Sequence, residues 1–301
     1  MTQVNTSPVV NPRAGGRLEL MVAARDCGGC QSQVDRWTDG VSDQLRTLEA
    51  RDSRLQDHLR NMVAPLELDD VPGLDIGVKY AAVTPGLTFG GDFYDVFPLG
   101  GQRYALVMGE AGGDGLEAAE QAVVLRLLVR FALCSTLSPG EAAAQVNRLC
   151  IRNGALAEPA SLFAAVYNAR TGTLTYINAG HEPALRRHGR TDRVEILGRT
   201  APKLGEGSVK DFEERSTILC ESDTLAIYTD GLIEHAPRCN PSLGIALLMR
   251  RVCCNDAESA AELAECVFTG TRGEAPANLF RDDACLMTIV RTGATLVALK
   301  G

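Results

Sequence analysis

The chain has 301 residues, 45% of them hydrophobic, so it can bury a sizeable core as one large domain with a tail or as two ordinary domains. Its net charge is −8 and it has no long Lys/Arg run, which argues against nucleic acid as a partner. No secretory signal is visible and no apolar stretch approaches the ~18–20 residues that span a bilayer, so we predict a cytoplasmic protein without membrane insertion.

The 10 cysteines are scattered along the chain, and free thiols are expected in a reducing compartment. Cys27 and Cys30 form a single C-x-x-C pair, which could be half of a zinc site or a redox pair. Because no second C-x-x-C pair and no H-x₃₋₅-H partner accompanies it, we interpret both residues as incidental thiols.

Residues 1–32 are rich in Gly, Pro, Asn and Ser without a clear period, which indicates a flexible leader. Apolar residues at steps of three, four or seven then predict an amphipathic helix over 33–62, which Pro65 ends. These apolar residues are Val34, Trp37, Val41, Leu45, Leu48, Leu55, Leu59 and Met62. So narrow an apolar stripe needs a partner, either its own domain or a second copy in a coiled coil.

Beyond Pro65, short segments of alternating apolar residues bounded by turn residues predict strands. The predicted strands are 71–85, 93–99, 103–109, 161–168, 173–179, 183–187, 194–197, 212–219, 223–230, 284–290 and 294–299. The predicted helices are 116–136, 139–152 with Ser138 as N-cap, and two near 242–252 and 256–268. Strands in hairpin order with helices inserted in pairs predict an α+β fold, with antiparallel sheet and helices on its outer faces.

Acidic residues recur at the ends of the predicted strands. They are Asp92 and Asp95 in GGDFYD, Glu110, Asp230, and the pair Asp282 and Asp283. One such residue is usually a turn former or a cap. A set of carboxylates gathered at one sheet edge would repel each other unless a cation neutralised them, and hard divalent cations prefer oxygen ligands. The set therefore indicates a metal site, with the two glycines allowing a tight turn before Asp92.

Four motifs, GGDFYDVF, NAGHEPAL, AIYTDGLIE and DDACLMTIV, resemble in order and spacing those of serine/threonine phosphatases of the RsbU/SpoIIE type, in the metal-dependent type 2C (PPM) superfamily. The resemblance implies an antiparallel β-sandwich flanked by helix pairs, the αββα arrangement, preceded by an N-terminal helix. It divides the chain into a flexible leader (1–32), a linker or regulatory helix (33–64), a PPM-type phosphatase domain (65–292) and a C-terminal strand or tail (293–301).

The resemblance also implies two Mn²⁺ or Mg²⁺ ions at one edge of the sandwich. Carried over by motif, the residues that hold them are Asp92, Glu110, the Ala111 carbonyl, Asp230 and Asp282, with Asp283 beside them. Asp92 would bridge both ions, and the nucleophile would be a metal-activated water rather than a side chain. His181 in NAGHEP is expected to be structural, since a lone histidine is a poor basis for acid–base chemistry.

The sequence departs from the family pattern at 109–115, which reads GEAGGDG. Glu110 stands where the family usually has Asp, and Asp114 where it usually has a basic residue. The extra methylene moves the carboxylate by roughly 1–1.5 Å. Either the backbone adjusts and Glu110 still ligates, or one metal binds weakly and the chain is a pseudophosphatase, a binding module without turnover.

The implied substrate is a bacterial regulatory protein phosphorylated on serine or threonine, by analogy an anti-sigma-factor antagonist. The helix 33–62 could form a regulatory homodimer. The ~30 mostly polar residues before it are too few for a sensor domain, so a separate sensor or activator protein is expected.

Overall fold

A computed structural model describes residues 68–83, 90–154, 156–191, 193–206, 212–234, 241–253, 257–272, 280 and 282–293. The described residues all belong to the second of two compact units, Ser53–Gly301. The predicted leader 1–32, the helix 33–62 and the strand 294–299 lie outside them, as do Cys27 and Cys30.

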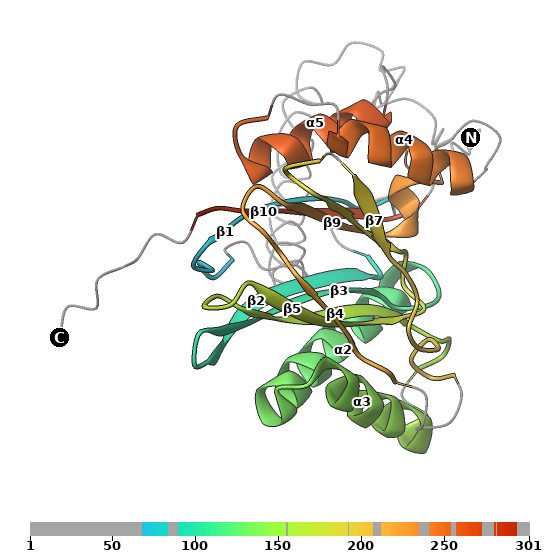
Figure 1. The fold of residues 1–301 in the computed structure, drawn as a ribbon. Helices are drawn as coiled ribbons and strands as arrows, with labels where there is room; N and C mark the ends of the chain where they lie inside the picture. The colour runs from blue at the N-terminus through green and yellow to red at the C-terminus, as the bar shows by residue number, and fades with distance from the viewer. Residues whose placement is uncertain are drawn as a thin grey trace, which may run out of the picture. The chain divides into compact units, whose positions relative to one another are not determined.

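Two five-stranded antiparallel sheets form the centre of this unit (Figure 1). In spatial order, the first sheet contains β2 (Asp92–Gly100), β3 (Arg103–Glu110), β4 (Ser161–Asn168), β5 (Thr173–Ala179) and β8 (Arg215–Ile218). The second sheet contains β1 (Leu74–Ala81), β10 (Ala284–Arg291), β9 (Thr224–Tyr228), β6 (Ala184–Arg187) and β7 (Val194–Leu197). The predicted α+β class with antiparallel sheet is therefore confirmed.

Helices cover the outer face of each sheet as pairs, giving the four layers seen in Figure 1. The first sheet carries α2 (Gly115–Thr136) and α3 (Pro139–Asn153); the second carries α4 (Pro241–Cys253) and α5 (Ala260–Arg272). Ser138 caps α3 as predicted, since its hydroxyl accepts a hydrogen bond from the Glu141 N–H. The start predicted near 256 for α5 is wrong, because Ser259 accepts from the Glu262 N–H and the helix begins after it.

Alternation along the strands divides the buried residues into three cores, one between each pair of adjacent layers. Phe93 and Phe97 of β2 face α2 and α3, whereas Tyr94 and Val96 of the same strand face the second sheet. The third core lies under α4 and α5. No helix among the described residues combines the length and apolar character needed to cross a bilayer.

The two aspartates of GGDFYD face different layers, because they lie three positions apart on one strand and successive side chains point to opposite faces. Asp95 points into the helix layer, where its carboxylate is 2% exposed. It accepts hydrogen bonds from Arg126 Nε at 3.2 Å and from Arg130 Nη1 at 3.0 and 2.9 Å. The Arg130 guanidinium also lies 4.3 Å from the centre of the Phe97 ring. Asp95 therefore fastens α2 to β2.

We expect Asp95→Asn to lower the free energy of unfolding by about 3 kcal/mol, because it leaves two guanidinium groups without their carboxylate in a largely buried site. Urea denaturation followed by circular dichroism measures this. The matched control is Glu120→Gln, which alters an exposed carboxylate on the same helix and should stay within about 0.5 kcal/mol of the parent. Equal urea midpoints for Asp95→Asn and the control would contradict the conclusion that Asp95 fastens α2 to β2.

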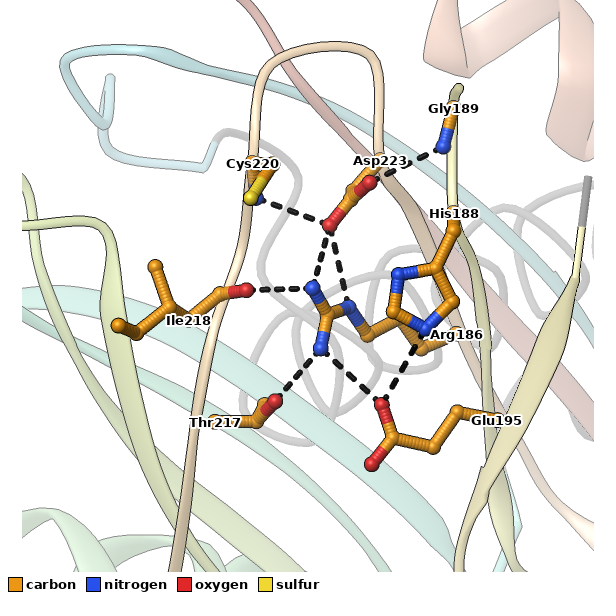
Figure 2. Close-up of polar contacts among 8 residues, drawn as sticks. All are labelled: Arg186, His188, Gly189, Glu195, Thr217, Ile218, Cys220 and Asp223. Atoms are coloured by element: carbon orange, nitrogen blue, oxygen red, sulfur yellow. Dashed lines mark hydrogen bonds and ion pairs between the residues drawn. The ribbon is translucent and has the colours of Figure 1, made fainter. Parts of the chain in front are cut away.

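A buried ion-pair network lies at the start of β9 (Figure 2). Arg186 of β6 donates to Asp223 Oδ2 from Nε at 3.1 Å and from Nη2 at 2.6 Å, and its Nη1 donates to Thr217 and Glu195. Asp223 also accepts hydrogen bonds from the backbone N–H groups of Cys220 and Gly189. The network joins β6, β7 and β8 to β9 and so links the two sheets at this end.

Candidate metal centre at the junction of the two sheets

All of the predicted acidic residues except Asp95 lie where β2 and β3 of the first sheet approach β9 and β10 of the second; Asp95, on the other face of β2, pairs with Arg126 and Arg130 instead. Asp92 opens β2 and lies directly opposite Glu110, the last residue of β3. Asp230 follows β9 in a short 3₁₀ turn (Asp230–Leu232), so the strand ends earlier than predicted, at Tyr228. Asp282 and Asp283 precede β10, the hydrogen-bonded neighbour of β9.

Asp92 is aimed across the junction by a residue of the other sheet. Its side chain is buried, and its Oδ2 accepts a hydrogen bond from the Thr229 hydroxyl at 2.7 Å. Thr229 Oγ1 in turn accepts from the Cys285 N–H at 2.8 Å. The orientation of Asp92 is therefore set by β9 and β10 rather than by its own strand.

Asp283 ties the segment before β2 to the end of β1. Its Oδ1 accepts from the Val83 N–H and its Oδ2 from the Gly91 N–H, both at 2.9 Å. A Cβ atom placed on Gly90 would lie 1.6 Å from Asp283 Oδ2, so no other residue fits at that position. The first glycine of GGDFYD thus makes room for this carboxylate.

Ala111 is also held at the junction. Its N–H donates to the Gly91 carbonyl at 2.9 Å, which places Ala111 beside the residue that precedes Asp92. A Cβ atom on Gly91 would come within 3.0 Å of the Ala111 carbonyl oxygen. The second glycine therefore permits the close approach of the two segments that carry Asp92 and Glu110.

The carboxylates perturb one another strongly. Burial and the Glu110 charge raise the pKa of Asp92 well above its usual value. Burial, followed by the Asp230 charge, raises the pKa of Glu110 to about 8. Burial and the Asp282 charge raise the pKa of Asp230 to about 6. The folded protein therefore gathers carboxylates that raise one another's pKa values.

Three neighbours of the cluster were not identified from the sequence as site residues: Thr229, Glu182 and Lys203. Thr229 directly precedes Asp230, and Glu182 follows His181 in the NAGHEP motif, so both lie in segments that the motifs had already marked. Lys203 lies in the connection after β7, outside every motif. It is the only one of the three without a signal in the sequence.

His181, expected to be structural, contacts residues of β4 and β5. It is buried, its Nδ1 lies 2.7 Å from the Ser161 hydroxyl, and its backbone N–H donates to Asn178 Oδ1 at 2.9 Å. Burial and the nearby Lys203 ammonium lower its pKa to about 3, so the imidazole is neutral at physiological pH. Its contacts hold together the ends of β4 and β5.

The donor set fits a hard divalent cation in its chemistry, because all the gathered side chains offer carboxylate oxygens and Asp92 is buried against a second carboxylate. Within the described residues, however, no group of three or more His, Cys, Asp or Glu side chains meets the geometry that a bound metal requires. The fold thus brings the proposed ligands to one sheet junction, and their role in binding a metal stays a prediction.

Two facing antiparallel sheets with outer helix pairs and acidic residues at the sheet junction define a PP2C-type fold. Residues 100–292 match the sequence model of a family described as Stage II sporulation protein E (SpoIIE). Because this match covers more than half of the chain, the protein belongs to the SpoIIE family. The resemblance found in the four motifs is thereby confirmed.

Curated relatives share about a quarter of their residues with this chain. Protein IcfG of Synechocystis is 25% identical, with the alignment covering 83% of this chain and 43% of the relative. The phosphoserine phosphatase RsbP of Bacillus subtilis is 24% identical, with coverage of 66% and 48%. The chain thus spans about half the length of these relatives.

Solved structures share the fold. The RsbU and RsbW domains of Rv1364c from Mycobacterium tuberculosis superpose with a TM-score of 0.68 at 26% identity, covering 78% of this chain and 63% of that one. The PP2C phosphatase domain of SpoIIE from Bacillus subtilis gives a TM-score of 0.63 at 19% identity, with coverage of 72% and 62%. RsbX in complex with magnesium gives 0.56 at 13% identity, with coverage of 74% and 98%.

Proposed function

We propose that the protein is a metal-dependent serine/threonine protein phosphatase. The observation that carries the proposal is the buried pairing of Asp92 with Glu110 at the sheet junction, within reach of the charges of Asp230 and Asp283. The members of such a cluster stay ionised together only with positive charge among them. Membership of the SpoIIE family and the name of the relative RsbP support the assignment.

Each residue of the cluster has a separate task. Asp92, Glu110, Asp230, Asp282 and the Ala111 carbonyl would hold Mn²⁺ or Mg²⁺, with Asp283 beside them as the group that shapes the Gly90–Gly91 turn. When bound, the two cations would supply the positive charge and activate a water for attack on phosphorus. Thr229 keeps Asp92 oriented and His181 keeps the neighbouring strand ends together.

The substrate that fits this proposal is a small cytoplasmic regulatory protein phosphorylated on serine or threonine, with an anti-sigma-factor antagonist as the first candidate. A homodimer through residues 33–62 and a separate activator belong to the same proposal. Size measurements on the full chain and on residues 65–301 test the dimer, because equal monomers would remove it.

The deciding experiment is hydrolysis of p-nitrophenyl phosphate by the purified chain in Mn²⁺, in Mg²⁺ and in EDTA. Activity that appears with the cation and disappears with EDTA supports the phosphatase. A stably folded protein without turnover at millimolar Mn²⁺ overturns it. Release of phosphate from a phosphorylated anti-sigma-factor antagonist then tests the substrate class.

A second candidate function is a pseudophosphatase that binds a phosphoprotein without turning it over. Two residues favour it: Glu110 and Asp114, which stand where the resembling phosphatases usually have Asp and a basic residue. Glu110→Asp separates the candidates. If the parent is inactive and Glu110→Asp is active, the longer side chain of Glu110 has impaired the site. If the parent is active and Glu110→Asp has equal or lower activity, Glu110 ligates as it stands.

We expect Thr229→Val to lower kcat/KM by about 10–100-fold, the effect usual for the partner of a ligating carboxylate. The substitution removes the hydroxyl that orients Asp92 and leaves the Cys285 N–H without its acceptor. The Mn²⁺ concentration for half-maximal p-nitrophenyl phosphate hydrolysis should rise in parallel. Thr229→Ser keeps the hydroxyl and should retain most of the activity; equal losses in the two variants would exclude a role for the hydrogen bond.

A further inference from the structure

The connection that follows β7 is held rigidly against the first sheet and α3. Ala160 and Leu204 exchange two backbone hydrogen bonds, of 2.9 and 2.8 Å. The Gly205 N–H donates to Oδ1 of the buried Asn147 on α3 at 2.7 Å. At the start of the connection, the Ala201 N–H donates to the Asn178 carbonyl at 3.0 Å. Residues 201–205 therefore have a defined position.

Lys203 lies between these anchors, and its side chain is directed by a glycine. Gly180, in the NAGHEP motif, has a φ of +66°, and a Cβ atom placed on it would lie 2.4 Å from Lys203 Cγ. The aliphatic stem of the half-buried lysine thus packs over the backbone of Gly180, next to His181. This packing fixes the direction in which the ammonium group leaves the connection.

Lys203 lies beside the acidic cluster, because its neighbour Leu204 pairs with Ala160, and the next residue, Ser161, pairs with Glu110 across β3 and β4. Burial raises the pKa of Glu110, Glu182 and Asp230, and the Lys203 charge opposes this rise in all three. Yet Lys203 forms no ion pair in the described part of the chain. Lys79, in contrast, is paired with Glu265 on α5. Lys203 is thus a positioned cation beside the proposed metal centre that is available to a further anion.

We propose that Lys203 binds a non-bridging oxygen of the substrate phosphoryl group. This inference rests on the proposed function, which brings a phosphate dianion to the carboxylate cluster. With the carboxylates neutralised by cations, the ammonium group would offer the incoming phosphate a fixed positive charge. An ammonium group can donate up to three hydrogen bonds to phosphate oxygens, and these charge-assisted bonds are the strong ones.

The test compares Lys203→Gln with Lys203→Arg and with Lys79→Gln, which removes a lysine charge outside the site. Binding of inorganic phosphate at saturating Mn²⁺ is measured by calorimetry, so that the result does not depend on turnover. The KM and kcat for p-nitrophenyl phosphate are measured alongside. Thermal unfolding of each variant verifies the fold, and Lys203→Arg keeps the charge if Lys203→Gln is unstable.

We expect Lys203→Gln to weaken phosphate binding about 10-fold or more and to raise KM similarly, since a hydrogen bond to a charged group is lost. Lys203→Arg should recover most of the affinity, and Lys79→Gln should match the parent. Phosphate affinity of Lys203→Gln within twofold of the parent would overturn the inference, and a parent that binds no phosphate at saturating Mn²⁺ would do the same.

The two proposals can fail separately. A parent that binds phosphate through Lys203 but hydrolyses no p-nitrophenyl phosphate would retain the inference and overturn the phosphatase. An active parent whose Lys203→Gln variant binds phosphate normally, but Mn²⁺ more tightly, would show that the lysine only balances the carboxylates.

Discussion

Asp92→Asn is expected to lower p-nitrophenyl phosphate hydrolysis by about 10³-fold, because it removes one charge from the carboxylate proposed to bridge both cations. Lewis-acid stabilisation by a bound metal contributes several kcal/mol, and about 4 kcal/mol corresponds to this factor. The amide still offers an oxygen to the Thr229 hydroxyl, which lies 2.7 Å from Asp92 Oδ2 in the parent. The loss should therefore come from the metal and not from the fold. Rates at saturating Mn²⁺ measure it.

The same substitution should stabilise the metal-free protein at pH 7. Burial and the Glu110 charge raise the pKa of Asp92, so the folded state holds its proton to higher pH than the unfolded state. Stability from this group therefore falls as pH rises above the unfolded pKa of about 3.9. Asparagine carries no charge and escapes this loss, so the thermal midpoint in EDTA should rise.

Asp95→Asn is the matched control, with the same change three residues along the same strand. It should lower stability through the loss of the Arg126 and Arg130 pairs and leave the rate of hydrolysis within a few-fold of the parent. An active Asp92→Asn variant, or a variant at position 95 that lost activity while folded, would reverse the roles assigned to the two aspartates.

Much of the fold could be predicted because the strands alternate and the helices have clear ends. β2 shows why: Phe93 and Phe97 on one side and Tyr94 and Val96 on the other reveal a strand buried on both faces. The start of α5 was misplaced because its capping residue, Ser259, follows other residues that could begin a helix. The pairing of β1 with β10 has no local signal, since it joins residues more than 200 positions apart.

The site was predictable where its residues sit in motifs and unpredictable where it depends on contacts between sheets. Asp92 and Glu110 come together through the register of one hairpin, which their positions at the strand ends suggested. The contact of Thr229 with Asp92 crosses from one sheet to the other. Lys203 is placed by the packing of its stem on Gly180 and by the hydrogen bond of the nearby Gly205 to Asn147 of α3. Such positions depend on packing that no single segment encodes.

Arg186→Met is expected to lower the free energy of unfolding by about 3–5 kcal/mol, the usual cost of leaving one member of a buried ion pair alone. Asp223 would remain buried with only the Cys220 and Gly189 N–H groups as donors, and the contacts of Arg186 to Thr217 and Glu195 would be lost (Figure 2). Urea denaturation at pH 7 measures the effect. Arg170→Ala, in the exposed turn between β4 and β5, is the control and should change little.

The pH dependence of the same variant tests the cause. Burial alone would raise the pKa of Asp223, but hydrogen bonds from Arg186, Cys220 and Gly189 and the Arg186 charge hold it below its usual value. A depressed carboxyl pKa contributes stability above the unfolded pKa of about 3.9, and this stability is lost as pH falls through the folded value. The difference in free energy of unfolding between the parent and Arg186→Met should therefore be largest at pH 7 and decrease below about pH 4. A difference that stays constant down to pH 3 would mean that Arg186 acts through its packing and its contacts with Thr217 and Glu195.

In the double variant Arg186→Met with Asp223→Leu, most of the lost stability should return, because no buried charge is then left unpaired.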